Sequence, residues 1–311
     1  MSEFSSNPIA QAFGQAASTY TTCALPQKCC AEGLWQLFDR CIASKPRIAS
    51  KPRIASKPPV APKPSVAPKE TPQGALEELP EESPEGLLER GLRPGPVLEL
   101  GCGTGFLTQG LLSRFGGKRS VEITDISSAM LTQCQQELKQ EKLPLETAAF
   151  YYLDGENLVS TRAYAMVASS FALQWFRAPE QSLPRLMQSL LPGGWLLLAF
   201  PSDRSFPQWH QRCRSLGLPR PGNPLPSAEA ILDVVRSQTR RCWSEERWLP
   251  LEFDSALAFF RHFKAIGAAT SAGSAQLSPR QLRQLIQAWD ALGPVRVDYH
   301  AVLLAAQLGS A

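Results

Sequence analysis

The sequence of 311 residues lacks any long apolar run: no strictly apolar stretch exceeds six residues, as in WLLLAF at 195–200. A membrane-spanning helix needs about 20 such residues, so none is expected within this sequence. The first twenty residues contain no apolar core flanked by positive charge, so neither a secretory signal nor a transit peptide is expected. We therefore expect a cytoplasmic protein without a membrane partner.

Histidine is scarce, and the eight cysteines are widely spread. The sequence has three histidines, no C-x-x-C pair, and no Cys/His group at the spacing of zinc ligands. We therefore expect no metal site. Because no export signal is recognised, we interpret the cysteines as free thiols in a reducing compartment rather than as a disulfide framework.

Proline and positive charge concentrate in residues 42–69, where the unit IASKPR is repeated with progressive changes. This tract holds seven prolines and seven basic residues but no acid, so it cannot bury a core and should be extended. Removing its seven charges from the formal +4 leaves −3, so the remaining chain is not basic. We predict a disordered Pro/Lys-rich linker over 42–85. Binding of an acidic partner by the tract is the alternative to a solvated spacer.

A helical pattern precedes this linker. Cys30, Leu34, Leu37, Phe38 and Cys41 fall on one face of a helix, and such an apolar stripe must pack against another part of the chain. Residues 1–41 are therefore predicted to form an N-terminal helical cap that docks on the main domain.

After residue 90 the chain alternates between strand and helix patterns. Strands are expected at 96–103, 119–125, 148–154, 164–170 and 193–200, with helices between them at 106–115, 127–140 and 179–191. This order predicts an α/β fold with a mostly parallel sheet covered on both faces. Farther along, we expect a helix at 228–237, a strand at 242–253, helices at 255–263 and 278–290, and a last strand at 297–307.

The turn after the first strand reads ELGCGTG over residues 99–105. Glycines in such a turn allow a ligand to approach the backbone closely. The dinucleotide pattern G-x-G-x-x-G/A fails because Phe106 stands at its last position, and no G-K-[ST] of a phosphate-binding loop follows. An acid followed by alternating glycines remains, at the carboxyl end of the first parallel strand, where open α/β sheets bind ligands.

Two acids stand at the ends of the next two strands. Asp125 follows Gly105 by 20 residues, where a carboxylate can accept hydrogen bonds from both ribose hydroxyls of a nucleoside. Asp154 is placed to meet an adenine amino group; the alternative is a turn residue before Gly155. Glu122 alternates with apolar residues inside the second strand, and we interpret it as structural.

These features resemble the class I S-adenosylmethionine-dependent methyltransferases over about residues 95–201. The resemblance implies a Rossmann-like fold, with a mostly parallel seven-stranded sheet, helices on both faces, and a helical lid from the N-terminus and the C-terminal half. It implies S-adenosylmethionine as cofactor and a methyltransferase domain over 86–311, with lid helices at about 254–291. It assigns Asp125 to the ribose and Asp154 to the adenine. The residues that it assigns to the methionine part are Glu99, Gly101, Gly103 and Gly105.

Other segments resemble the malonyl-[acyl-carrier protein] O-methyltransferases of biotin synthesis. FGQAASTY with Gln27 is similar to the opening of that family, ALQW at 172–175 to its motif after the fourth strand, and FKAIGA at 263–268 to its lid motif. DYHAVLL resembles its last strand. This resemblance implies methylation of the free carboxylate of a malonyl thioester, an early step of biotin synthesis. The acyl group would be carried by acyl-carrier protein or by coenzyme A.

Such a reaction requires no general base, because a carboxylate with a pKa of about 4 is already ionised at pH 7. The enzyme then positions and desolvates the reactants, so we predict no catalytic residue and no metal. Lys264 is the first candidate to hold the malonyl carboxylate, with Tyr20, Gln174 and Trp175 lining the pocket.

Two other functions remain open. One is a class I methyltransferase that acts on another small acceptor, such as a quinone precursor. The other is a non-catalytic protein that binds a partner through the basic tract. A DNA adenine methyltransferase would carry an Asn/Asp-Pro-Pro-aromatic run after the fourth strand, where this chain has SSFALQWF, so no nucleic-acid partner is expected.

Overall fold

The computed structural model describes residues 7–43, 91–158, 163–268 and 276–309. Most of the predicted linker, residues 44–85, lies outside these described residues. Its first two residues, Ile42 and Ala43, belong to the end of a helix, so the helical segment runs two residues farther than predicted. No helix in the described ranges is long and apolar enough to cross a membrane.

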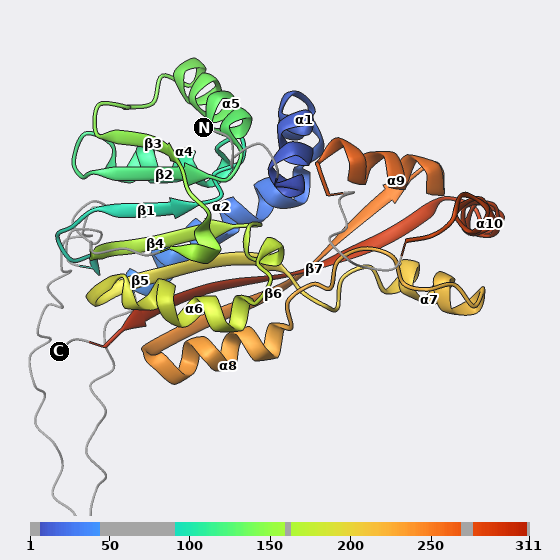
Figure 1. The fold of residues 1–311 in the computed structure, drawn as a ribbon. Coiled ribbons are helices and arrows are strands. Elements are labelled where there is room, and N and C mark those ends of the chain that lie inside the picture. Colours follow the sequence, from blue (N-terminus) through green and yellow to red (C-terminus); the bar gives the residue numbers. More distant parts are fainter. Residues whose placement is uncertain (1–6, 44–90, 159–162, 269–275, 310–311) are drawn as a thin grey trace, which may run out of the picture.

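The centre of the molecule is a seven-stranded sheet in the order β3-β2-β1-β4-β5-β7-β6 (Figure 1). Strands β1 to β5 pair in parallel, and β7 lies antiparallel between β5 and β6. The predicted Rossmann-like sheet is therefore confirmed. The helix expected over 179–191 ends at residue 188, because the backbone there turns directly into the next strand. The strands are β1 (Val97–Leu100), β2 (Val121–Asp125), β3 (Ala148–Tyr152), β4 (Tyr164–Ser170), β5 (Leu190–Pro201), β6 (Thr239–Phe253) and β7 (Val295–Leu308).

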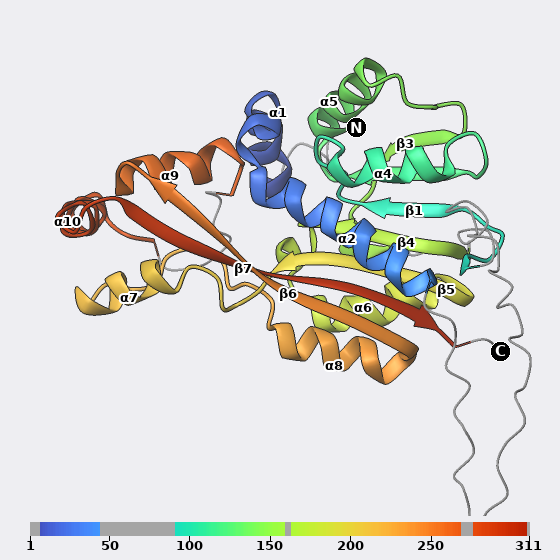
Figure 2. The ribbon, with the colours of Figure 1, turned by 180° about the vertical axis from the view of Figure 1, so that it is seen from behind.

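Helices cover both faces of this sheet (Figures 1 and 2). Side chains alternate between the two faces along each strand. Val97 packs into the core under the first group of helices, whereas Leu98 and Leu100 pack into the core under the second. The first group is α2 (Leu25–Ala43), α4 (Phe106–Phe115) and α5 (Ser128–Gln140), and the second is α6 (Pro179–Gln188) and α8 (Ala228–Gln238).

The two N-terminal helices precede the sheet in sequence but pack against its later elements. Helix α1 (Pro8–Cys23) begins after Asn7, whose side chain accepts a hydrogen bond from the N–H of Ile9 at 2.9 Å. The predicted apolar stripe of α2 is buried against β7, β5 and α4 (Figure 2). Helix α1 contacts α5 and α9, so it stands beside the carboxyl end of β1 (Figure 1).

Strands β6 and β7 continue past the end of β5. The pairing of β5 with β7 ends at Pro201 and Ala301, whereas β6 and β7 stay paired as far as Phe253 and Val295. Helices α7 (Pro207–Ser215) and α9 (Ala256–Ala265) pack on this two-stranded extension, and α10 (Pro279–Asp290) packs on both of them. Helix α7 is absent from the elements predicted by sequence because it has only two buried apolar residues.

Candidate active site

A cavity of about 970 Å³ lies at the carboxyl ends of β1 to β4. The strand order reverses between β1 and β4, and ligands of open α/β sheets bind at such switch points. Most of the predicted cofactor residues meet here. The structure brings into the lining Glu99, Gly101, Gly103, Asp125 and Asp154.

The glycine-rich turn after β1 requires left-handed backbone. Gly101 has φ +71°, and a Cβ at this position would lie 2.5 Å from the Cβ of Ala172. Gly103 has φ +54°, and a Cβ there would meet nothing closer than 3.8 Å, so its backbone faces the open cavity. Gly105 differs from the prediction: it lines neither cavity described here, and its φ of +104° starts α4 instead. The left-handed backbone there accounts for glycine at 105 without a ligand, and a contact of Gly105 with the cofactor stays a prediction.

Asp125 ends β2 and is buried against the glycine turn. Its Oδ2 accepts the N–H of Gly103 at 2.9 Å, and its Oδ1 accepts the N–H of Ser127 at 2.8 Å. Burial nevertheless raises the pKa of Asp125 to about 6, because these backbone hydrogen bonds only partly offset the lost hydration. Each carboxylate oxygen keeps a lone pair for a further donor.

Glu99 is the most deeply buried acid of the cavity, with 1% of its surface exposed. Its Oε2 has no hydrogen-bond partner in the described structure. Burial raises the pKa of Glu99 to about 8; a hydrogen bond with Thr108 opposes this shift, and the charge of Asp125 adds to it. A buried carboxyl without a partner is costly, so this position favours a ligand that supplies a donor or a positive charge.

Asp154 is a turn residue within the site, and its contact with adenine stays a prediction. It precedes the short helix η1 (Gly155–Asn157), and its side chain accepts the N–H of Glu156 at 3.1 Å and the amide of Asn157 at 2.8 Å. It is therefore a turn residue, and it also lines the larger cavity. Glu122, interpreted as structural, accepts hydrogen bonds from two tyrosines within the sheet and does not line the cavity.

A smaller cavity of about 100 Å³ adjoins the larger one. Its outer walls come from α7, α9, β7 and the loop over 220–225. Two bulky residues in this lining, Phe171 and Phe206, have φ of +56° and +59°. Such backbone strain in aromatic residues is typical of functional sites. The two cavities share Phe13, Tyr20, Gln27, Phe171, Gln174, Trp175, Asn223 and Leu225.

Three of the four predicted acceptor residues meet at this shared wall: Tyr20, Gln174 and Trp175. Burial, and the charge of Asp125, raise the pKa of Tyr20, so its hydroxyl stays protonated. Lys264 is exposed on α9 and lines neither cavity, so the structure does not place its ammonium group where it would hold an acceptor. The residue of α9 that lines the smaller cavity is Phe263.

Sequence reasoning missed Phe13, His210 and Arg220, which all line the smaller cavity. Phe13 and Tyr20 are seven residues apart in the segment FGQAASTY, and that spacing places them on one helix face. His210 is one of only three histidines, but it carries no recognisable motif. Arg220 lies in the loop GLPRPGNPLP, where neither helix nor strand periodicity indicates which way a side chain points.

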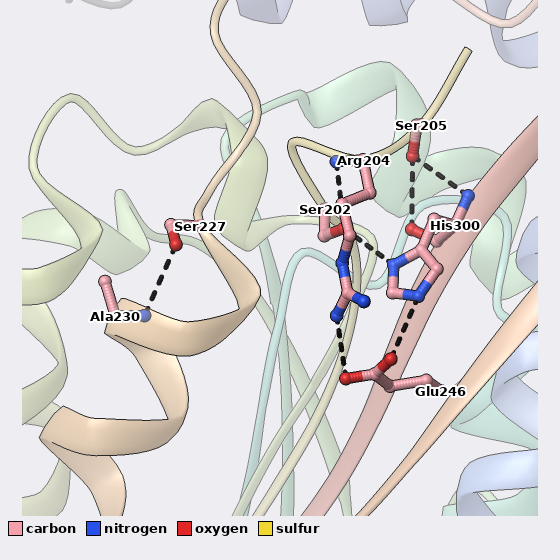
Figure 3. Close-up of polar contacts among 7 residues, drawn as sticks. All are labelled: Ser202, Arg204, Ser205, Ser227, Ala230, Glu246 and His300. Carbon is pink, nitrogen blue, oxygen red and sulfur yellow. Dashed lines mark hydrogen bonds and ion pairs between the residues drawn. The ribbon is translucent and has the colours of Figure 1, made fainter. Parts of the chain in front are cut away.

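A partly buried polar cluster lies beside the loop after β5 (Figure 3). The Oγ of Ser202 lies 2.7 Å from Nδ1 of His300, and Nε2 of His300 lies 3.2 Å from Oε2 of Glu246. Glu246 also pairs with Arg204 at 2.7 Å. Neither Ser202 nor His300 lines a cavity, and both are fully buried, so the cluster resembles a hydrolytic triad only in composition. These hydrogen bonds hold in place the loop that leads to Phe206.

Comparison with known proteins agrees with this geometry. Residues 97–194 match the family described as "Methyltransferase domain". The chain is 33% identical over 202 residues to a malonyl-[acyl-carrier protein] O-methyltransferase of Magnetococcus marinus, a match that covers 62% of this chain and 70% of the relative. The chain belongs to this methyltransferase family. It is therefore an S-adenosylmethionine-dependent methyltransferase.

Two further likenesses are less extensive. A trans-aconitate 2-methyltransferase of Variovorax paradoxus is 32% identical over 140 residues, covering 45% of this chain and 51% of the relative. The crystal structure of the YcgJ protein of Bacillus subtilis superposes with a TM-score of 0.50 at 13% identity, covering 73% of this chain and 98% of that protein. The second likeness shows the fold alone.

The larger cavity fits the cofactor of this family. Its volume suits a nucleoside-sized ligand. Several of its buried polar atoms lack protein partners, and such atoms await a ligand or water. These atoms are Gln27 Oε1, Glu99 Oε2, Ser170 Oγ, Gln174 Oε1 and Trp175 Nε1.

Proposed function

We propose that this methyltransferase esterifies the free carboxylate of a malonyl thioester, an early step of biotin synthesis, with the acyl group carried by acyl-carrier protein or coenzyme A. The observation that carries the proposal is the contrast in charge between the two cavities. Glu99, Asp125 and Asp154 line the larger one, which suits a positively charged cofactor. No aspartate or glutamate lines the smaller one, which suits a short anionic acceptor.

In this proposal the larger cavity orders the cofactor along the ends of the strands. Glu99 and the backbone at Gly101 and Gly103 hold the methionine part, because Glu99 has an unpartnered carboxyl oxygen and Gly103 leaves space beside its backbone. Asp125 accepts the ribose hydroxyls, and Asp154 meets the adenine. When bound, S-adenosylmethionine supplies a methyl group on a positively charged sulfur.

The acceptor enters the smaller cavity. Tyr20, Gln174 and Trp175 form the wall between the two cavities, so they separate and align the reactants. The Nε1–H of Trp175 and the Oε1 of Gln174 are buried without protein partners. Gln174 donates its amide to the carbonyl of Phe171 at 2.6 Å, which fixes the direction of the free oxygen.

The proposed chemistry requires positioning rather than proton transfer. A malonyl carboxylate is ionised at pH 7 and attacks as it stands, so the protein needs no base. The aromatic walls exclude water from the carboxylate, and the fixed arrangement removes much of the entropy cost of bringing two reactants together. The absence of acids from the lining of the smaller cavity avoids repulsion of the incoming anion.

The test is direct. The full chain is incubated with methyl-labelled S-adenosylmethionine and malonyl-acyl-carrier protein, and in parallel with malonyl-coenzyme A. Mass spectrometry should find one added methyl group on the malonyl part. Acetyl-acyl-carrier protein, which has no free carboxylate, serves as the control. Turnover of the acetyl substrate, or none with either malonyl thioester, would contradict the proposed acceptor.

A different carboxylic acid is the second candidate, favoured by the similarity to the trans-aconitate 2-methyltransferase. The small volume of the acceptor cavity and the single guanidinium group in its lining suit one carboxylate better than the three of trans-aconitate. Competition of trans-aconitate with the malonyl thioester in the same assay discriminates between the two.

The basic tract offers a third, non-catalytic reading, in which recruitment of an acidic partner is the function. Deleting residues 44–69 leaves α2 intact and removes most of the repeat. In our proposal this deletion leaves methyl transfer unchanged. Loss of partner binding with no methyl transfer by either protein would favour the third reading.

A further inference from the structure

The smaller cavity has one charged side chain in its lining. No aspartate or glutamate lines it. The ionisable residues among the described residues of its lining are Tyr20, His210, Arg220 and Tyr299. Burial raises the pKa of both tyrosines, so they are neutral at pH 7. The guanidinium group of Arg220 therefore sets the charge of this cavity.

His210 does not add to that charge. Burial, and then the charges of Arg220 and Arg214, lower the pKa of His210 to about 4. Its imidazole is neutral at pH 7 and stacks beside Trp209, with ring centroids 6.1 Å apart. A neutral imidazole at this position leaves Arg220 as the only cation facing the smaller cavity in the described structure.

Arg220 is also available to a ligand. It forms no hydrogen bond or ion pair with any described residue, and its side chain is exposed where the loop between α7 and α8 meets the cavity. By contrast, Arg204 and Arg247, which lie on neighbouring elements, are each paired with a glutamate. A guanidinium group left unpaired beside an apolar cavity is suited to a carboxylate, because its donors match the two oxygens.

We propose that Arg220 is the acceptor-binding residue that selects an acyl thioester with a free carboxylate. This inference rests on the proposed function. A carboxylate that leaves water for an aromatic cavity needs a charged partner, and Arg220 supplies it. Methyl transfer converts the carboxylate into a neutral ester, which forms no ion pair with Arg220. The same residue therefore favours binding of the substrate and release of the product.

The experiment compares the affinity for the substrate with that for its own methyl ester. Calorimetry on the full chain, with S-adenosylhomocysteine present, measures binding of malonyl-coenzyme A and of its methyl ester; malonyl-acyl-carrier protein and its ester replace them if coenzyme A is not accepted. The wild type should prefer the acid by about 10- to 150-fold, the range expected for a hydrogen-bonded charged pair. Arg220→Met should bind both ligands nearly equally, and Arg220→Lys should keep part of the preference.

Arg214→Met is the matched control, because Arg214 also faces His210 but lines neither cavity. It should keep the full preference. An Arg220→Met protein that retains the preference, or that loses affinity for acid and ester equally, would overturn the inference. An equal loss of affinity for the acid and the ester would mean that Arg220 contacts the carrier or supports the fold.

The proposed function and this inference can fail separately. If the wild type methylates no malonyl thioester, the proposed function fails. Binding of malonate itself, again with S-adenosylhomocysteine present, then tests Arg220. Wild-type binding that Arg220→Met abolishes would support the anion site, and equal binding by both proteins would refute it.

Discussion

The backbone N–H of Gly103 donates to the carboxylate of Asp125 at 2.9 Å. This hydrogen bond joins the glycine turn after β1 to the end of β2, so the two predicted cofactor contacts form one unit. Any change at Asp125 acts on both. Asp125 also lines the larger cavity, which the backbone of Gly103 leaves open.

Asp125→Ala should weaken S-adenosylmethionine binding by about 10- to 150-fold, because a charged acceptor of hydrogen bonds contributes about 1.5–3 kcal/mol. Asp125→Asn keeps one acceptor oxygen, so it should lose less affinity for S-adenosylmethionine than Asp125→Ala. Calorimetry on the two folded variants measures the difference. Unchanged affinity in Asp125→Ala would remove Asp125 from the ribose site.

The affinity for the cofactor should rise with pH between about 6.5 and 8.5. Glu99 has a pKa of about 8 in the free protein, so it is largely protonated at pH 7. A positively charged ligand favours the ionised form, and binding below pH 8 must release this proton. The dissociation constant therefore falls as pH rises, by at most about tenfold per pH unit, and levels off above the pKa of Glu99.

Calorimetry in two buffers with different ionisation enthalpies counts the released protons. Glu99→Gln should bind more weakly, release no proton in this range and lose the pH dependence. The same proton release from Glu99→Gln as from the wild type would assign the titration to another group. Working above pH 6.5 keeps Asp125, with its pKa of about 6, mostly ionised.

Gly101→Ala and Gly117→Ala form a matched pair for the glycine turn. The two glycines have φ of +71° and +72°, so backbone strain alone should cost alanine about 1–2 kcal/mol of stability at either position, and the contact at 101 should add to that cost. A Cβ at 101 would lie 2.5 Å from the Cβ of Ala172, whereas one at 117 meets nothing within 4 Å. Only Gly101→Ala should also weaken cofactor binding, as measured on folded protein. If the Gly101→Ala and Gly117→Ala proteins bind the cofactor with equal affinity, the turn tolerates the contact with Ala172.

Ser202→Ala should destabilise the fold by about 1–3 kcal/mol, because it leaves Nδ1 of the buried His300 without its partner (Figure 3). Ser113→Ala is the control, since its hydroxyl bonds a helix carbonyl at an exposed position and should contribute little. Chemical denaturation of both variants measures the difference. The Michaelis constant for the acceptor should also rise in Ser202→Ala, because the loop leads to Phe206 in the smaller cavity. A stability equal to that of Ser113→Ala would mean that the cluster is not structural.

The cofactor side of the site follows closely from the sequence. Glu99, Gly101, Gly103, Asp125 and Asp154 stand at the ends of consecutive strands of a parallel sheet, and strand ends of such a sheet meet at one edge. Gly105 shows the limit of this rule. Turn geometry requires glycine in such a turn as strongly as a ligand does, and a motif alone does not separate the two requirements.

The acceptor side could not be predicted in the same way. It is built from α1, the turn after β4, the loop at 220–225 and α9, which are distant in sequence and meet only through tertiary packing. Lys264 illustrates the reason. Phe263 near the end of α9 and Ile266 directly after it line the smaller cavity, whereas Lys264 is exposed.

By itself the sequence determined the alternation of strands and helices, the buried stripe of α2 and the glycine turn that lines the larger cavity, because these depend on local periodicity and on neighbouring strand ends. Only the tertiary structure decided which cation lines the smaller cavity. The outcome depends on which face of α9 turns toward the cavity and on the path of the loop that carries Arg220. Both are set by long-range packing.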